Sequence, residues 1–387
     1  MTLLRDVPLA LYVHLPWCVR KCPYCDFNSH AVPGAGLPQE PYVAALLDDL
    51  RHAAAQCAGR EIVSVFFGGG TPSLFSPGSV ARVLRGARGL LPFAADAEIT
   101  LEANPGTLER GRFADYAAAG VNRVSLGAQS FDDEKLEQLG RIHAGREIEA
   151  AVEDLRAAGI GNFNLDLMYA LPQQKLEEAL VDVARAVELA PTHLSHYQLT
   201  LEPGTPFARR PPQLPDDEAA YDMQLACQEA IAAAGYAQYE VSAYAQPSRR
   251  CAHNLNYWQY GDYLGIGAGA HGKITDSASG SIVRTARARH PAAYLAAAEP
   301  AERVVEFREI GADERPFEFA LNALRLLEGF SFETFEARTG LARRVLDRPV
   351  AEAVARGLLV ERAGGGWRPT GLGARFLNDL QRLFLPE

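Results

Sequence analysis

Short apolar runs alternate with amphipathic segments through the first half of the chain. Leu9–Leu15 has the pattern of a buried strand, and the apolar positions of about residues 41–57 recur at helical spacing. This strand–helix alternation repeats about every 30 to 40 residues, which is typical of parallel βαβ units. Further strands are expected at 62–67, 98–103, 123–127, 163–168 and 193–199, and further helices at about 110–119, between the strands at 123–127 and 163–168, and at 176–189.

Six such units before residue 205 predict an α/β fold, a partial (β/α)6 barrel similar to an open TIM barrel. Polar residues gather after the predicted strands, where barrels of this kind hold their sites. The stretch 203–215 carries five of the 24 prolines, so we expect a loop there that leads the chain out of the barrel.

From about residue 315 the pattern changes to short helices, expected at 317–327, from Ser331 onward and at 342–352, before a hairpin of 358–361 and 366–370. Three helices and a hairpin resemble a winged helix. We therefore expect a barrel with its C-terminal extension over residues 1–305 and a small winged-helix-like domain over 306–387. DNA binding through Arg343, Arg344 and Arg348 is disfavoured because the chain is acidic, so a packing or lid role is the better interpretation.

The composition is that of a globular protein, with 48% hydrophobic and 22% charged residues in a chain of 387. The net charge of -10 argues against nucleic acid as a partner. No apolar run reaches the roughly 18 residues of a membrane span, so none is expected. Met1–Asp6 lacks the features of a signal peptide, and unpaired cysteines suit a reducing compartment, so we expect a cytoplasmic protein.

Three of the six cysteines, Cys18, Cys22 and Cys25, form a C-x3-C-x2-C pattern directly after the first predicted strand. Cysteines this close in a loop are better metal ligands than disulfide partners. A structural zinc ion needs a fourth ligand, and Phe27, two positions after the last cysteine, cannot serve. A 4Fe-4S cluster accepts three thiolates when one iron takes another ligand. A degraded zinc knuckle is the weaker alternative.

This spacing resembles the radical S-adenosyl-L-methionine (SAM) superfamily. In that superfamily the amino and carboxylate groups of SAM chelate the open iron, and the reduced cluster donates an electron to the sulfonium. The resemblance therefore implies two cofactors, a 4Fe-4S cluster and SAM.

Polar residues and glycines after the later strands are candidates for the same site. Taken alone, Gly68–Thr71 is explained equally well as a tight turn and as a backbone cradle for a carboxylate or an amine. A structural role is likewise as good an explanation as a functional one for each of Glu102, Gln129, Ser130, Arg141 and Asp166. Their gathering at successive strand ends favours one shared site. Carried over from the family by resemblance, the SAM contacts are Tyr12, Tyr24, Gly69, Gly70, Thr71, Glu102, Gln129, Arg141 and Asp166. No catalytic side chain is assigned.

Four segments narrow the resemblance to the HemN/HemW group: Tyr12–Cys18, Gly68–Pro72, Leu126–Phe131 and Asn164–Pro172. The group contains an oxygen-independent coproporphyrinogen III dehydrogenase and a heme chaperone. The dehydrogenase has a fourth cysteine where Phe27 stands here, and an N-terminal extension where about eight residues precede the first strand. Both differences, together with the segment Cys25–His30, favour the chaperone branch. The resemblance to that branch implies that the protein binds heme, passes it to heme-accepting proteins, with respiratory hemoproteins as candidates, and lacks dehydrogenase activity. The dehydrogenase stays as the alternative.

Cys251–Trp258 resembles an HNxxYW motif of that branch, so His253, Tyr257 and Trp258 are heme candidates, with His271 as a second ligand candidate. From residue types alone, a core histidine with two packed aromatics is the better reading. The glycines at 265, 267 and 269 are expected to let the backbone approach the cofactor pocket, and their spacing does not fit a dinucleotide fingerprint. The oligomeric state is open between a monomer and a cluster-dependent dimer.

Overall fold

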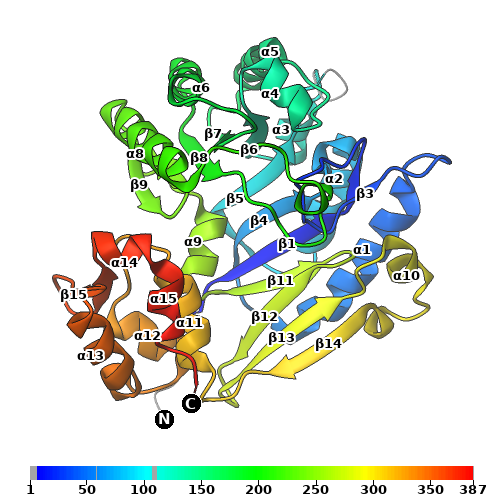
Figure 1. Cartoon of the computed structure of the whole chain (residues 1–387). Coiled ribbons are helices and arrows are strands. Elements are labelled where there is room, and N and C mark those ends of the chain that lie inside the picture. Colours follow the sequence, from blue (N-terminus) through cyan, green and yellow to red (C-terminus); the bar gives the residue numbers. More distant parts are fainter. Residues whose placement is uncertain (1–6, 58, 107–110, 387) are drawn as a thin grey trace.

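The computed structural model describes residues 7–57, 59–106 and 111–386. Its centre is a twelve-stranded sheet with the order β14-β13-β12-β11-β1-β4-β5-β6-β7-β8-β10-β9 (Figure 1). Six adjacent strands run parallel, so the partial (β/α)6 barrel is confirmed. They are β1 (Leu9–Leu15), β4 (Ile62–Gly69), β5 (Phe93–Ala103), β6 (Arg123–Gln129), β7 (Phe163–Tyr169) and β8 (His193–Gln198).

Helices cover the outer face of the parallel strands, and their apolar sides join the main hydrophobic core (Figure 1). Cys57 is fully buried in this core, at the end of a short 3-10 turn, Ala55–Cys57. The helix expected from about Arg110 begins at Phe113, while Arg110 and Met1–Asp6 lie outside the described residues. These helices are α1 (Gln39–Ala54), α2 (Pro77–Arg88), α3 (Phe113–Ala119), α5 (Gly145–Ala157), α6 (Leu176–Glu188) and α8 (Asp217–Ala233). The short helix α4 (Asp133–Gln138) follows β6.

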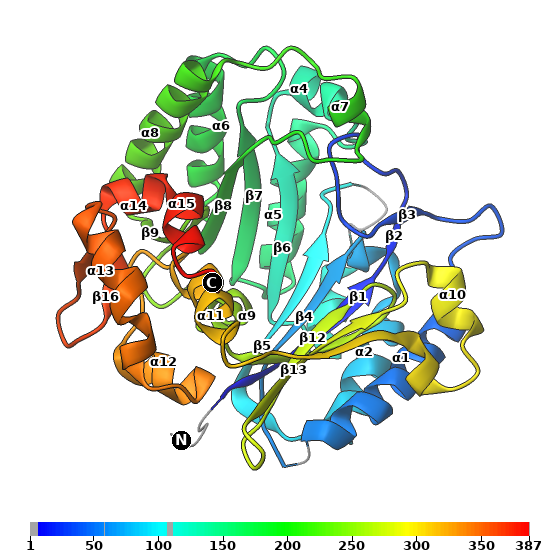
Figure 2. The same cartoon turned by 60° about the horizontal axis from the view of Figure 1, so that its bottom comes forward.

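Short strands that the pattern did not predict extend the sheet at both edges (Figure 2). Beside β1, a parallel strand is followed by three antiparallel ones. These are β11 (Asp262–Ile266), β12 (His271–Asp276), β13 (Ser281–Arg287) and β14 (Val304–Glu309), with α10 (Pro291–Ala296) before β14. Beyond β8 lie β10 (Ala243–Ala245) and β9 (Ala237–Glu240), and α9 (Ala252–Trp258) connects this edge to β11.

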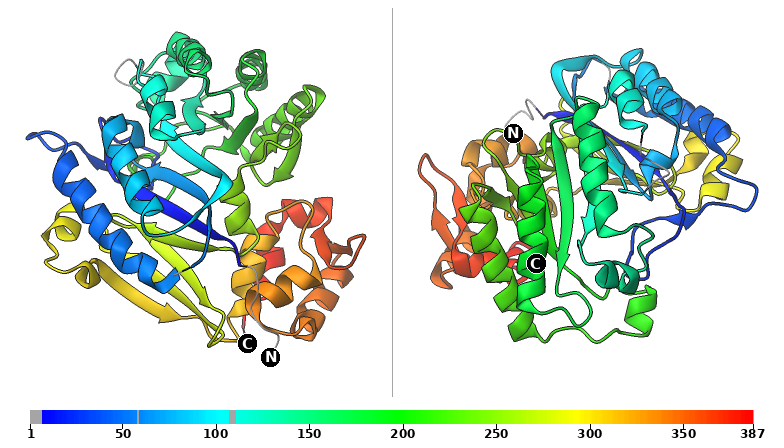
Figure 3. Two further views of the ribbon diagram at one scale, coloured as in Figure 1. Left: turned by 180° about the vertical axis from the view of Figure 1, so that it is seen from behind. Right: turned by 90° about the horizontal axis from the view of Figure 1, so that it is seen from above.

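The C-terminal region forms the expected lobe of short helices with a hairpin, next to α9 (Figure 3). Its core also contains Tyr260 and Ile282 from the barrel extension, so the lobe is packed onto the sheet. Its elements are α11 (Arg315–Ala323), α12 (Phe332–Thr339), α13 (Asp347–Ala355), β15 (Leu359–Glu361), β16 (Trp367–Pro369), α14 (Gly371–Arg375) and α15 (Leu377–Arg382), the last two not predicted.

The proline-rich segment is a loop with one helical turn, α7 (Pro206–Arg209), which begins where the Thr205 side chain accepts a hydrogen bond from the Ala208 N–H. Phe207 donates its N–H to the Pro23 carbonyl at 3.1 Å, so this segment lies against the cysteine loop. No described helix combines the length and apolar character needed to cross a bilayer.

Candidate functional site: a cysteine loop facing the carboxyl ends of the strands

The cysteine loop is held by backbone contacts that only glycine permits. After β1 the chain forms β2 (Trp17–Cys18), which pairs in parallel with β3 (His30–Ala31) beyond the loop. The Gly70 and Thr71 N–H groups donate to the Leu15 and Trp17 carbonyls at 2.9 and 2.8 Å. A Cβ atom at Gly70 would lie 2.5 Å from the Trp17 carbonyl oxygen, and Gly69 has φ +122°. The glycines therefore bring the end of β4 directly against the loop.

A second set of contacts holds the far arm of the loop. Asn28 donates from Nδ2 to the carbonyls of Ala268 and Arg289 at 2.9 and 2.8 Å, and its own carbonyl accepts from His14 Nε2 at 2.8 Å. A Cβ atom at Gly269 would lie 2.2 Å from Asn28 Nδ2. The glycine-rich segment 265–272 thus makes room for the loop's anchor, and His271 stands exposed at the start of β12.

The three thiols line a cavity of about 660 Å³ at the carboxyl ends of the parallel strands. Burial raises the pKa of the Cys18 and Cys25 thiols, while the Cys22 sulfur lies 3.7 Å from Arg141 Nη1. Among the described residues, no group of three His, Cys, Asp or Glu side chains is placed to hold a single metal ion. A cubane cluster differs, because each thiolate binds its own iron. This donor set therefore fits a three-cysteine cluster better than zinc.

Two carboxyl groups face the cavity from neighbouring strand ends. Glu102 accepts the Gly69 N–H at 3.1 Å, and burial, followed by repulsion from Asp166, raises its pKa to about 8. Asp166 accepts from Ser125 Oγ at 3.1 Å and Asn164 Nδ2 at 2.8 Å, and burial raises its pKa as well. Two buried carboxyl groups at neighbouring strand ends suit a ligand that carries hydroxyl groups and positive charge.

Gln129 and Arg141 present buried polar atoms that no described residue satisfies. Gln129 sits at φ +63°, where the pairing of β6 with β7 shifts register, and its Oε1 has no partner. Arg141 donates from Nη2 to Asn104 Oδ1 at 2.5 Å and to the Gly127 carbonyl at 3.0 Å, but its Nε has no partner. A buried donor or acceptor without a hydrogen-bond partner destabilises the fold, and a ligand that bonds these atoms would remove that cost.

Most of the predicted SAM contacts meet around this one cavity. Tyr24, Gly69, Gly70, Thr71, Glu102, Gln129, Arg141 and Asp166 line it together with Cys18, Cys22 and Cys25. Tyr12 does not line it, because its hydroxyl bonds His14 Nδ1 at 2.9 Å behind the glycine segment. Ser130 is turned away and donates to Asp182.

Several polar lining residues were missed from the sequence, among them Asn104, Ser125 and Tyr197. Asn104 bridges Thr71 Oγ1, at 3.1 Å, and Arg141. Each of these three residues lies in a parallel strand or directly after one, and a position at a strand end was also the feature that made Glu102 a candidate.

The heme candidates of the Cys251–Trp258 segment lie outside this cavity. His253 is 1% exposed, and its ring nitrogens pair with Ser64 Oγ at 3.0 Å and Tyr257 Oη at 3.2 Å. Burial lowers the pKa of His253 to about 3. In this conformation the imidazole has no free nitrogen to bind iron, as expected for a histidine that is part of the core. Trp258 carries the Arg325 guanidinium 4.3 Å above its ring.

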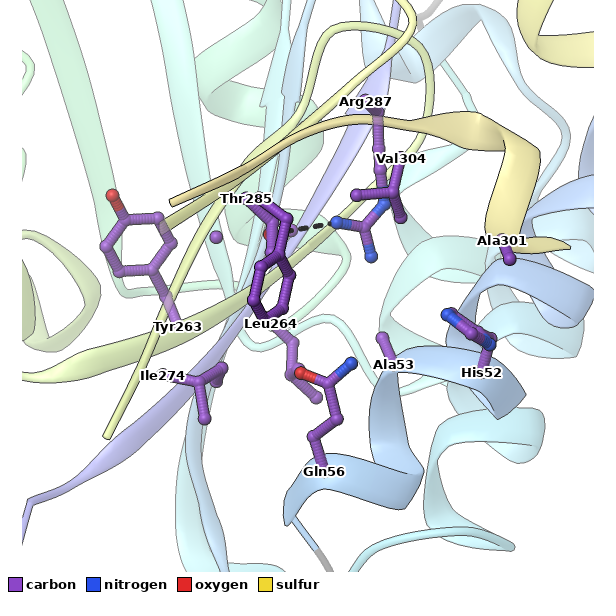
Figure 4. A pocket seen from close by; sticks show the side chains of 13 residues that line it. His52, Ala53, Gln56, Tyr263, Leu264, Ile274, Thr285, Arg287, Ala301 and Val304 are labelled. Carbon is purple, nitrogen blue, oxygen red and sulfur yellow. Dashed lines mark hydrogen bonds between the residues drawn. The ribbon is translucent and has the colours of Figure 1, made fainter. Parts of the chain in front are cut away.

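A smaller cavity of about 280 Å³ lies between α1 and the strands β11 to β14 (Figure 4). Arg287 faces it but is already held by Asp49, at 3.0 Å, and by Thr285, at 3.0 Å. The pocket therefore presents no uncompensated charge to a ligand.

Comparisons with known proteins agree with this geometry. The radical SAM superfamily profile matches residues 12–185, and the HemN C-terminal domain profile matches 310–376. The heme chaperone HemW of Escherichia coli is 52% identical over 98% of this chain and 99% of its own, and that of Haemophilus influenzae is 48% identical over 98% of each. The structure of Escherichia coli coproporphyrinogen III oxidase (HemN) superposes with a TM-score of 0.82 at 24% identity, over 98% of this chain and 90% of that one, which shows the shared fold. The chain belongs to the radical SAM superfamily and, within it, to the HemW family.

Proposed function

We propose that the protein is a heme chaperone that binds heme beside a SAM-ligated 4Fe-4S cluster and passes the heme to acceptor hemoproteins. The observation that carries this proposal is the 52% identity to the Escherichia coli heme chaperone over the whole of both chains. Identity of that extent covers the cysteine loop, the strand ends and the C-terminal lobe together. We also infer a cytoplasmic location and a domain boundary near residue 305.

Each cofactor has an assigned set of residues in this proposal. Cys18, Cys22 and Cys25 hold the cluster through three thiolates. Arg141 faces the SAM carboxylate with its partnerless Nε, Gly69 and Gly70 face the amino group, and Glu102 accepts hydrogen bonds from the ribose hydroxyls. Tyr24, Thr71, Gln129 and Asp166 complete the lining, whereas Tyr12 supports it through His14. When bound, the cluster supplies a one-electron reductant for the sulfonium of SAM.

Phe27 supports the chaperone over the dehydrogenase. Its side chain is 63% exposed at the edge of the cavity, in the position where the dehydrogenase branch has a fourth cysteine. The alternative, oxygen-independent coproporphyrinogen III dehydrogenase, is favoured by one observation, the nearly complete set of SAM contacts around the cavity. A regulatory use of SAM requires the same contacts, so this observation does not favour the dehydrogenase alone.

Transfer of heme to an apoprotein tests the proposal. The anaerobically reconstituted protein, loaded with one heme, is mixed with an apo b-type cytochrome, and the acceptor's Soret band is followed. We expect faster and more complete formation of holocytochrome than from free heme with serum albumin as a carrier control. Failure to load heme, or retention of all of it, would contradict the chaperone function.

A further inference from the structure

A second, larger cavity adjoins the cofactor cavity. It has a volume of about 930 Å³ and is lined by residues of α8 on the barrel and of α14 and α15 of the C-terminal lobe. Figure 2 shows these helices next to one another. Gln198 and Arg325 line both cavities, so the two are neighbours at the end of β8. The volume falls within the roughly 300–1,000 Å³ typical of cofactor sites. We call this space the interlobe cleft.

The walls of the interlobe cleft offer apolar surface from both sides. Leu225 of α8 is 46% exposed, Val241 is 38% exposed, and Phe376 of the lobe is 45% exposed. The Arg375 guanidinium lies 4.2 Å from the Tyr221 ring centroid and 5.6 Å from that of Phe376, so both aromatic rings of the cleft contact it. Exposed aromatic and aliphatic side chains gathered in a cleft mark a binding surface for an apolar, flat group.

Two arginines supply positive charge at the cleft. Arg375 makes no ion pair with any described carboxylate and rests on the two aromatic rings alone. Arg325 donates from Nη2 to Glu240 at 3.2 Å, while its Nε is buried without a partner. Two acids also line the cleft: Asp379 pairs with Arg382 at 3.4 Å, and Asp217 lies in the first turn of α8, where the helix dipole stabilises its charge.

We propose that the interlobe cleft binds a carboxylated tetrapyrrole, with the ring against the apolar wall and the carboxylate arms on Arg325 and Arg375. The proposal rests on the proposed function and locates the heme of that function. Charge complementarity and the apolar wall both point to this occupant, because a porphyrin is a flat apolar disc with two propionates. Among the described residues that line the cleft there is no His, Cys or Met, so Tyr221 is the one wall side chain of a kind that ligates heme iron, and the ring is held mainly by the apolar wall and the two arginines. A carrier that must release its heme benefits from such a site.

The same proposal explains the aromatic end of the Cys251–Trp258 segment. Trp258 does not line either cavity, but its ring supports the guanidinium of Arg325. We therefore assign Trp258 as a positioning residue for Arg325. This role requires no movement of buried His253.

Porphyrin titrations on the anaerobically reconstituted full chain test the cleft. The Arg375→Ala variant removes the exposed cation, and Arg356→Ala removes another exposed arginine of the same lobe that does not line the cleft. We expect Arg375→Ala to weaken heme binding about tenfold or more, the usual range for a lost charge-assisted hydrogen bond, and Arg356→Ala to leave it unchanged. Iron-free protoporphyrin IX should compete with heme, and its dimethyl ester should not.

Several outcomes would overturn the proposal. If Arg375→Ala and Arg325→Gln both bind heme as tightly as the wild-type protein and unfold at the wild-type temperature, the cleft is excluded as the heme site. The chaperone function would remain intact. Competition by the dimethyl ester as strong as that by the free acid would exclude the arginine–carboxylate contacts. No heme binding by the wild-type protein would instead refute the proposed function itself.

Discussion

At the scale of single residues, the site is defined by polar atoms that the fold buries but does not satisfy. Gln129 Oε1 and Arg141 Nε have no partner among the described residues, although the atoms around them are densely bonded. Polar residues at successive strand ends indicated that Glu102, Gln129 and Asp166 share one site, and the family resemblance assigned them to SAM, a role that stays a prediction. The same resemblance named Tyr12, but its hydroxyl turns to His14, and only the three-dimensional packing determines that direction.

Replacing Arg141 by Lys tests the carboxylate contact. A lysine keeps the charge but loses the planar fork that bonds Asn104, the Gly127 carbonyl and a ligand at once. We expect SAM affinity to fall about tenfold, as for loss of one charge-assisted hydrogen bond, with the iron content unchanged. Anaerobic calorimetry measures the affinity, and Arg146→Lys on the exposed surface of α5 is the control. Wild-type affinity in Arg141→Lys would remove Arg141 from the SAM site.

His253 makes the free energy of unfolding depend on pH. Burial lowers its pKa to about 3, from 6.5 in the unfolded chain. Below pH 6.5 the imidazole is therefore protonated in the unfolded chain but stays neutral in the native protein. The contribution of His253 to the free energy of unfolding is thus fully present above pH 6.5 and falls as the pH drops towards 3. At pH 5 this costs about 2 kcal/mol relative to pH 7.

The His253→Gln variant keeps hydrogen-bonding capacity without a titrating group. Its stability deficit relative to wild type should therefore shrink by about 2 kcal/mol between pH 7 and pH 5. Urea denaturation at both pH values measures this difference, with His52→Gln on the exposed face of α1 as control. A deficit that is the same at both pH values would show that His253 titrates normally.

At the scale of elements, the parallel strands were predictable because each is a short apolar run bounded by turn residues and followed by an amphipathic helix. The edge strands were not. Val304–Glu309 mixes charged and apolar residues, and its pairing with β13 shifts register between Ala286 and Arg287, so no simple alternation marks it. The short helices α14 and α15, of five and six residues, are too brief for a helical period to appear.

Gly70→Ala tests how tightly β4 and the cysteine loop are joined. The added Cβ would lie 2.5 Å from the Trp17 carbonyl oxygen, a backbone atom with no freedom to move away. We expect the free energy of unfolding to fall by about 1–3 kcal/mol, and iron incorporation to fall because the loop is displaced. Gly161→Ala is the matched control, since no atom lies within 4 Å of its added Cβ. Equal iron content and stability in the two variants would mean that the loop is held elsewhere.

At the scale of the whole molecule, the barrel extension and the C-terminal lobe share one hydrophobic core. Phe319 of the lobe is fully buried and packs edge-on against Tyr260, with ring centroids 5.8 Å apart. The helices α11, α12 and α13 of the lobe were predicted from the sequence. Its attachment was not, because Tyr260 and Ile282 are ordinary apolar residues until the fold brings them under α11.

Phe319→Ala tests that attachment. A buried phenylalanine cut to alanine costs about 3–5 kcal/mol, and because the core is shared we expect one cooperative unfolding transition at lower temperature. Differential scanning calorimetry measures it, and Leu372→Ala, at a side chain 48% exposed in the same lobe, should change little. Two separate transitions in the variant would show that the lobe unfolds independently of the barrel.

The most direct test of the central claim is heme titration and a coproporphyrinogen III dehydrogenase assay on one anaerobic, cluster-reconstituted preparation. The account predicts saturable heme binding with about one heme per chain, SAM binding to the cluster, and no protoporphyrinogen IX. Formation of protoporphyrinogen IX coupled to SAM cleavage, without saturable heme binding, would contradict it.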